Sequence, residues 1–151
     1  MQTETKLCEK IIKESEQLLI PGAIRSLANL PVAKPLPIFR DEELLNDPEK
    51  PYFGKYSGDE DTRRKPAYHN GTAWTWPFPS YAEALLTTYG IEAINTARSI
   101  LLSSKIIIDE GSILQVPEII DGDFPHNLKG CGAQAWGATE LYRLLKITDL
   151  I

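Results

Sequence analysis

The pattern of apolar and polar residues predicts an amphipathic helix near the start of the chain. Across residues 5–19, apolar side chains recur at helical spacing with Glu and Lys between them. Pro21 and Gly22 interrupt this pattern, and a short second helical piece is predicted over residues 23–30. Pro31 ends that piece, because proline cannot donate the next hydrogen bond of a helix.

Helical periodicity returns in the second half of the chain. Ser80 and Glu83 have the spacing of a capping box, in which the serine hydroxyl accepts a hydrogen bond from an exposed amide and Glu83 reaches back to the start of the helix. Gly90 suits the left-handed position that ends a helix, and a further apolar stripe begins at Ile91 and ends before Gly111. Two consecutive helices are therefore predicted.

The class predicted for the whole chain is mainly α. The β-branched run 105–108 fits a helix tail or buried turn better than a strand. A second irregular stretch, 111–132, precedes a final helix with small and leucine residues inward from Ala135, and Arg143 and Lys146 lie near its electronegative end. Helices thus come in pairs joined by long loops.

The segment 31–79 shows no periodicity and holds eight of the eleven prolines. Long loops of this kind are either functional surfaces or disordered linkers. Linkers are poor in aromatic residues because they have no core to join, whereas this segment is rich in them: Tyr52, Phe53, Tyr56, Tyr68, Trp74, Trp76 and Phe78 fall in it. A functional surface is the better interpretation.

Composition fits a single unit over residues 1–151. The chain is 42% hydrophobic with a net charge of -5. It has no apolar run near the roughly 18–20 residues of a membrane helix and no apolar stretch where a signal peptide would have one, so no membrane partner and a cytoplasmic location are expected. The absence of a Lys/Arg cluster argues against nucleic acid. Cys8 and Cys131 lack metal-ligand spacing, so no metal, cofactor or disulfide scaffold is expected.

The densest cluster of candidate chemistry is the stretch Tyr68–Pro77, where aromatic rings alternate with amide, imidazole and hydroxyl groups. A pyranose has apolar C–H faces that stack on such rings and a rim of hydroxyls that amides and imidazoles bind. Each Trp or Tyr alone is more often a core residue. A lone histidine is more often structural than catalytic, but the loop position of His69 beside Asn70 and Gly71 makes a ligand contact equally compatible with the sequence.

A second cluster runs from Pro117 to Trp136. Glu118 lies between Pro117 and two isoleucines, surroundings that restrain a carboxylate as a general base requires. From spacing alone, a surface glutamate just after a turn is the better interpretation. Asp121-Gly122-Asp123 is consistent with a plain turn, and Gln134 and Trp136 either face a ligand or pack.

Together the two clusters resemble the C-terminal amylo-α-1,6-glucosidase domain of glycogen debranching enzymes, in particular their bacterial and archaeal relatives. The resemblance depends on matching order and spacing as well as matching residues. The words that carry it are Tyr68-His69-Asn70-Gly71-Thr72 with Trp74 and Trp76, Pro117-Glu118-Ile119 with Gly122, and Gly130-Cys131 through Gln134-Ala135-Trp136. Weaker matches lie in Ile24-Arg25-Ser26-Leu27 and in Tyr56-Ser57-Gly58-Asp59 with Arg63.

The resemblance implies a partial six-fold α/α barrel whose loops form a sugar pocket. It also implies cleavage of α-1,6-glucosidic branches with inversion, for which one carboxylic acid protonates the leaving oxygen and a carboxylate activates water. Glu118 matches the general base. An α-glucan, such as glycogen, is the implied substrate. The residues implied to bind it are Tyr68, His69, Asn70, Gly71, Trp74, Trp76, Gln134 and Trp136.

Three departures from the family pattern qualify this expectation. The family's general acid is an aspartate well upstream of Tyr68, and the chain starts too late to include it. Asp59 and Asp61 also precede Tyr68, but nothing in the sequence assigns the role of the acid to either. About five helices are predicted where six pairs would close a barrel. Arg64-Lys65 also stands where an acidic residue after the arginine is expected. We therefore expect little activity without an upstream segment.

An alternative to a hydrolase fragment remains open at this point, which is a non-catalytic α-glucan-binding remnant or helical interaction module. The partner of the apolar helix faces is also open. It is either the N-terminal part of the same enzyme or a second copy, since large apolar patches rarely stay bare.

Overall fold

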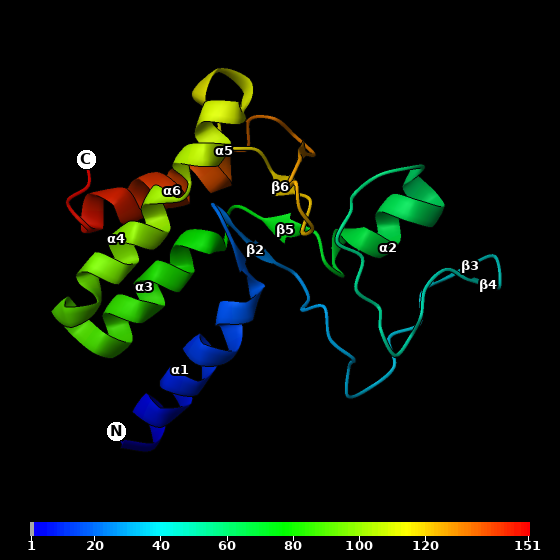
Figure 1. Ribbon diagram of the computed structural model, residues 1–151, viewed down its shortest axis with the longest axis horizontal. Helices are drawn as coiled ribbons and strands as arrows, with labels where there is room; N and C mark the ends of the chain where they lie inside the picture. Colours follow the sequence, from blue (N-terminus) through cyan, green and yellow to red (C-terminus); the bar gives the residue numbers. More distant parts are fainter. Residues whose placement is uncertain (1) are drawn as a thin grey trace.

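The computed structural model describes residues 2–151 and shows a mainly α-helical fold with a small antiparallel sheet. About half of the described residues are helical. The longer helices gather on one side of the sheet, and extended loops lie on the other (Figure 1). The predicted class is confirmed at this level. No α/α barrel is seen within the described part of the chain.

Five helices form the larger half of the molecule. They are α1 (Gln2–Ser15), α3 (Phe78–Tyr89), α4 (Ile94–Leu102), α5 (Lys105–Glu110) and α6 (Ala135–Ile147). Helix α3 is central, because it packs against α1, α4 and α6. The short helical turns are η1 (Glu16–Leu18), η2 (Glu60–Arg64), α2 (Lys65–Tyr68), η3 (Gly90–Ala93) and η4 (Ser112–Leu114).

A five-stranded antiparallel sheet occupies the middle of the molecule. Its strands, in spatial order, are β1 (Leu19–Ile20), β2 (Ala23–Arg25), β5 (Ala73–Trp74), β6 (Ile119–Ile120) and β7 (Leu128–Lys129). Trp74 pairs with Ile24 on one side and with Ile119 on the other. A separate hairpin, β3 (Phe39–Arg40) and β4 (Glu43–Leu44), extends away from the sheet (Figure 1).

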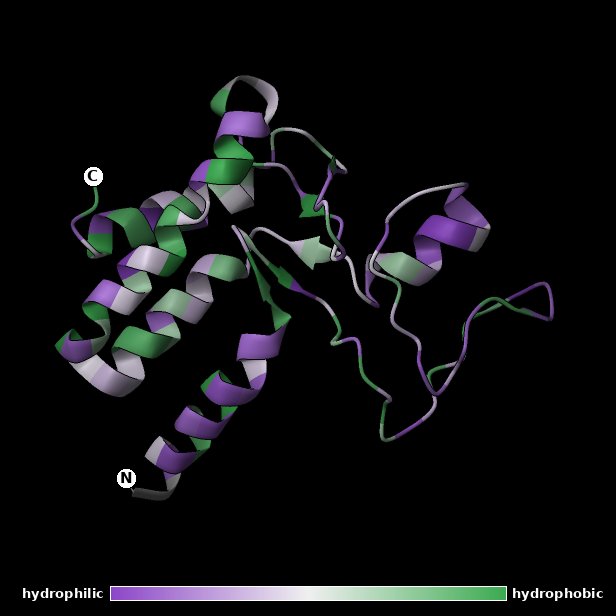
Figure 2. Cartoon of the chain, viewed as in Figure 1, coloured by the Kyte–Doolittle hydropathy of each residue, from purple (hydrophilic) through white to green (hydrophobic). Residues whose placement is uncertain are grey.

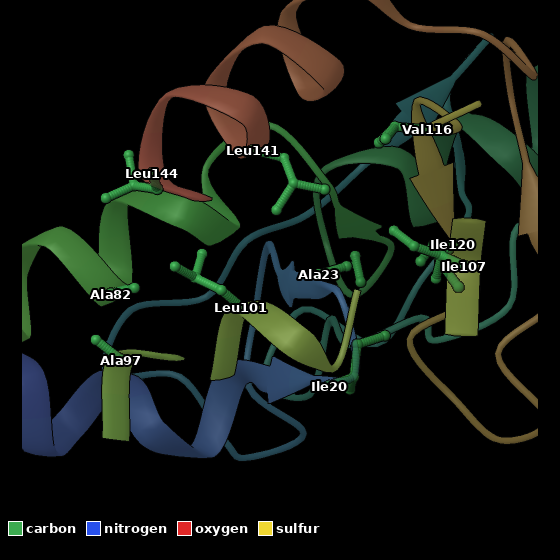
Figure 3. Packing of buried hydrophobic residues seen from close by; sticks show 11 residues of the cluster. Ile20, Ala23, Ala82, Ala97, Leu101, Ile107, Val116, Ile120, Leu141 and Leu144 are labelled. Carbon is green, nitrogen blue, oxygen red and sulfur yellow. The ribbon is translucent and has the colours of Figure 1, made fainter. Parts of the chain in front are cut away.

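The main core lies between one face of this sheet and the helices. Figure 3 shows it closely packed, with small side chains on the sheet and in α3 and α4 where the elements approach each other. Its buried members are Ile20, Ala23, Ala73, Ala82, Ala97, Leu101, Ile107, Val116, Ile120, Leu141 and Leu144. Because side chains alternate along a strand, Trp74 and its strand neighbours Ile24 and Ile119 face the opposite way. That second face is available for a site.

The helix predicted over residues 23–30 is wrong. Residues 23–25 form β2, which pairs with both β1 and β5, and no helix follows before Pro31. The first helix likewise ends at Ser15, before the predicted Leu19, because Leu19 already belongs to β1. Strand pairing across long sequence separations overrides the local helical spacing here.

The predicted capping box at Ser80 is also wrong. Helix α3 begins at Phe78, so Ser80 lies inside its first turn, and Glu83 forms a bidentate ion pair with Arg143 of α6 at 2.7 and 2.8 Å. The single helix predicted from Ile91 breaks after α4. The hydroxyl of Ser103 there accepts a hydrogen bond of 3.1 Å from the Gly22 amide, which docks the β1–β2 turn against the break.

The ends of the later helices follow the prediction. Gly90 has a positive φ of 65° where α3 ends, the run 105–108 is helical within α5, and α6 covers the predicted final helix. Figure 2 shows that α1 is polar along one side and apolar along the other. Among the described residues, no helix is both long and apolar enough to cross a membrane.

Candidate active site

Trp74 anchors the first predicted cluster on the free face of the sheet. Its backbone lies in β5 between β2 and β6, and its indole Nε1 donates a hydrogen bond of 3.1 Å to the carbonyl oxygen of Tyr68 at the end of α2. The loop that joins α2 to β5 is thereby folded back onto the strand. The aromatic residues of this segment consequently meet at one place.

The rings of this cluster contact one another at defined angles. His69 stacks on Trp74 with ring centroids 5.6 Å apart and planes 4° from parallel, and Tyr68 packs edge-on against Trp74 at 4.7 Å. Trp76 and Trp136 form a second, tilted pair at 5.6 Å. Edge-on and offset arrangements are those that aromatic rings favour. The rings therefore form an ordered wall.

A cavity of about 360 Å³ is hollowed into this wall. Its size falls in the range of small-molecule sites. The side chains of Trp76 and Trp136 are 40% and 50% exposed and so offer free ring surface. The lining residues are Ile24, Arg25, Ser26, His69, Trp74, Trp76, Pro77 and Trp136. Four of the predicted substrate-binding residues are thus brought together, although Trp136 is far from the others in sequence.

Glu118 is held at both carboxylate oxygens. The hydroxyl of Tyr68 donates to Oε1 at 2.6 Å, and the backbone amide of Cys131 donates to Oε2 at 3.0 Å. The main chain is fixed too, since the Glu118 carbonyl accepts a hydrogen bond from the Thr75 amide at 3.3 Å. The side chain is half-buried. This arrangement orients a carboxylate and leaves each oxygen a further lone pair to accept another hydrogen bond.

Tyr68 serves as a hydrogen-bond donor that holds its proton. Burial, then the hydrogen bond to Glu118, then the negative charge of that carboxylate raise the pKa of Tyr68 to about 12. The phenol is therefore neutral at any physiological pH. Its hydrogen stays directed at Glu118.

The aromatic cavity and Glu118 adjoin through Tyr68. The Tyr68 ring contacts His69 and Trp74, which line the cavity, while its hydroxyl binds Glu118, which is not among the lining residues. Tyr56 packs on the same ring with centroids 5.5 Å apart. Tyr68 thus forms a partition between the apolar cavity and the carboxylate.

Besides Tyr68, three predicted binding residues do not line the cavity. Asn70 donates its side-chain amide to the carbonyl of Pro66 at 2.8 Å, which closes the turn after α2. Gly71 has a φ of 143°, and a Cβ there would lie 2.5 Å from the carbonyl oxygen of Phe53. Gln134 precedes α6, and its backbone amide donates a hydrogen bond of 2.8 Å to the carbonyl of Val116. Their roles toward substrate stay predictions.

Two aspartates after β6 hold the loop 52–56 against the site. Asp121, 3% exposed, accepts a hydrogen bond from the Tyr56 amide at 2.8 Å, and Asp123 accepts one from the Tyr52 hydroxyl at 2.8 Å. Burial, followed by the hydrogen bond and charge of Asp123, raises the pKa of Tyr52 to about 12. The predicted turn at 121–123 is thus also a tether.

Sequence reasoning missed several residues that build the site. Arg25 and Ser26 line the cavity, and Cys131 contributes a backbone amide that no side-chain pattern signals. The first two lay in the weaker matching words, which was the one available signal. Across the described residues, no three His, Cys, Asp or Glu side chains gather as a metal site would require.

Comparison with known families covers most of the residues that form this site. A family model described as Amylo-alpha-1,6-glucosidase matches residues 43–143, about two thirds of the chain. The chain belongs to the amylo-alpha-1,6-glucosidase family. No curated protein and no solved structure matches it.

Family membership confirms the resemblance that the sequence motifs indicated. As an amylo-alpha-1,6-glucosidase family member, the chain is a glycoside hydrolase domain of the glycogen-debranching type. The matched range includes Tyr68, Trp74, Glu118 and Trp136. The hydrogen bond between Tyr68 and Glu118 and most of the aromatic wall therefore lie inside the family's own region, whereas β1, β2 and α1 lie outside it.

Proposed function

We propose that this domain supplies the general base and the glucose-binding wall for inverting hydrolysis of α-1,6-glucosidic branches in glycogen-like α-glucans. Glu118 is the proposed base. The observation that carries the proposal is the 2.6 Å hydrogen bond from Tyr68 to Glu118, because it joins the carboxylate to the aromatic wall.

The chemistry of the cavity favours a neutral sugar. Three indoles and an imidazole provide flat apolar faces for pyranose C–H groups, while Arg25 and Ser26, which also line the cavity, donate hydrogen bonds to the carbonyls of Gly122 and Thr72. In this proposal a terminal glucose lies against Trp76 and Trp136, which are 40% and 50% exposed.

The position of Glu118 favours a base over a nucleophile or a surface charge. Two donors fix its orientation, and its half-buried side chain remains open to a water molecule. Inverting enzymes separate their two carboxyl groups by roughly 6.5–9.5 Å so that water fits between the base and the sugar. The Tyr68 ring separates Glu118 from the cavity, so in this proposal the water binds at the open side of the half-buried carboxylate.

We infer that the general acid comes from a segment other than residues 2–151. The nearby aspartates are engaged elsewhere: Asp121 and Asp123 bind the loop 52–56, Asp59 caps η2 by accepting from Thr62, and Asp61 pairs with Arg40 and Lys65. We further propose that α1 and α3–α6 form part of an α/α barrel completed by the rest of the enzyme. The exposed Leu7 and Ile11 of α1 fit a face that another helix covers.

The test is the substitution Glu118→Gln in the active enzyme that contains this domain. A general base contributes about 10²- to 10⁴-fold, so turnover of an α-1,6-branched dextrin should fall by that factor. Calorimetric affinity for the same dextrin should stay within about twofold, because the amide keeps the shape of the side chain. Glu92→Gln, an exposed glutamate of η3, is the matched control. Unchanged turnover in Glu118→Gln would refute the assignment.

A second candidate is α-glucan binding without hydrolysis. It is favoured by one observation, which is that Glu118 does not line the cavity that the aromatic rings form. This alternative predicts that maltooligosaccharides bind with equal affinity to the wild type and Glu118→Gln, and that no glucose is released even when the remainder of the enzyme is supplied.

A further inference from the structure

The strand pair β6–β7 becomes irregular next to Glu118. Ile119 pairs with Lys129 and Ile120 with Leu128, as in a regular ladder. Glu118, the residue just before β6, donates its amide hydrogen to the carbonyl of Cys131 at 2.8 Å, so two residues, Gly130 and Cys131, lie opposite one. Gly130 has a φ of 68°. A left-handed glycine followed by a second residue against a single partner is a G1 β-bulge.

The bulge directs a main-chain donor at the Glu118 side chain. In it the Cys131 amide donates to Oε2 of Glu118 at 3.0 Å, while the Cys131 carbonyl accepts from the Glu118 amide. Cys131 thus binds both the main chain and the carboxylate of one residue. A backbone amide is a rigid donor, because it has no side-chain rotamers to lose.

Gly130 is required at this bulge for two reasons. Its positive φ is costly for any residue with a Cβ. A Cβ at this position would also lie 2.6 Å from Oε2 and 3.1 Å from the Cβ of Glu118. The carboxylate occupies the space that a side chain at residue 130 would take.

We propose that the Gly130–Cys131 bulge is a positioning element for Glu118, setting the plane of its carboxylate by fixing Oε2 while Tyr68 fixes Oε1. Its importance for catalysis rests on the proposed role of Glu118 as general base. Gly130 and Cys131 act only through Glu118 and need not touch substrate. Misplacing a catalytic group by about 1 Å costs roughly 10²-fold in rate, so the bulge is expected to affect turnover more than binding.

The first experiment follows the Cys131 amide proton by NMR during a pH titration of the wild-type chain. Because that proton forms a hydrogen bond to Oε2, its resonance should move as the Glu118 carboxyl ionises, and the movement should vanish in Glu118→Gln. A Cys131 resonance with the same pH response in both proteins would overturn the proposal. This experiment needs neither hydrolysis nor a glycine variant that folds.

The second experiment compares Gly130→Ala with Gly132→Ala in the active enzyme. Gly132 is a matched control, since its φ lies outside the left-handed range and its nearest neighbour to a new Cβ is the Ser112 hydroxyl at 3.2 Å. We expect kcat to fall roughly 10²-fold in Gly130→Ala with KM within about twofold, and Gly132→Ala to resemble the wild type. Equal kcat values for the two variants would overturn the positioning role.

The turnover of Glu118→Gln and the titration of the Cys131 amide together separate this inference from the proposed function. If Glu118→Gln leaves turnover unchanged while the Cys131 resonance still reports Glu118, the bulge positions a carboxylate that is not the base. If Glu118→Gln abolishes turnover while the Cys131 resonance does not report Glu118, the base is correct and the bulge does not position it.

Discussion

The hydroxyl of Tyr68 donates a 2.6 Å hydrogen bond to Oε1 of Glu118, although fifty positions separate the two residues in the chain. Tyr68 ends α2 and Glu118 precedes β6, so the bond exists only because β5 and β6 are paired. The same phenol packs against Trp74. Tyr68 is therefore the residue through which the aromatic wall and the carboxylate are held together.

Replacing Tyr68 with Phe removes the donor and keeps the ring. A hydrogen bond to a charged group contributes about 1.5–3 kcal/mol, so we expect kcat to fall by about 10- to 100-fold in the active enzyme, with a small change in KM. Steady-state kinetics on an α-1,6-branched dextrin measures this. Tyr142→Phe, an exposed tyrosine of α6, is the control. An equal fall in the control would show that the loss is not specific to Glu118.

Tyr52 and Tyr68 should ionise later than ordinary tyrosines. Burial and a carboxylate partner raise the pKa of each to about 12, above the ordinary tyrosine value of 10.0. Between these pH values the unfolded chain releases protons that the folded chain retains, so their stabilising contribution is full below pH 10 and is lost as pH rises toward 12. Tyrosinate absorbance at high pH should show a late phase, and Tyr52→Phe and Tyr68→Phe should each shrink it. A late phase as large as that of the wild type in either variant would contradict the assignment.

Trp76→Ala should weaken sugar binding without unfolding the domain. The ring is 40% exposed and lines the cavity, so its removal takes away a stacking surface and little core. Aromatic contacts of this kind contribute about 0.5–1.5 kcal/mol, which corresponds to a roughly 2- to 12-fold loss of affinity by titration calorimetry with maltooligosaccharides. Tyr142→Ala is the matched control, and equal affinities would exclude the cavity as the binding site.

Thr75 should be a stability residue beneath the site. Its buried hydroxyl donates to the carbonyl of Pro117 at 2.6 Å, and its backbone amide donates to the carbonyl of Glu118. Thr75→Val leaves the Pro117 carbonyl without this donor, at a cost of about 1–3 kcal/mol in the free energy of unfolding. Thr75→Ser keeps the hydroxyl and should lose less. Urea denaturation compares the two, and a more stable Val variant would contradict this role.

Part of the site was readable from the chain because its residues are close in sequence. Tyr68, His69, Trp74 and Trp76 fall within nine residues, and their aromatic character in a loop indicated a sugar surface before any contact was known. Glu118 was indicated by its position after Pro117 and by the motif Pro117-Glu118-Ile119 that carries the family resemblance. The Cys131 amide could not be, because every residue except proline carries one and only the bulge at Gly130 directs it.

The sequence by itself determined the mainly α class, the later helices and the family. Periodicity of apolar residues follows from the geometry of one helix, and the matching words keep their order whether or not the chain is folded. Tertiary structure decided the sheet, whose strands of two or three residues are too short to show alternation, and it turned residues 23–25 from helix into strand. It also decided which rings share a cavity and which donors hold Glu118. Those contacts depend on strand pairing and packing between distant segments, which local spacing does not encode.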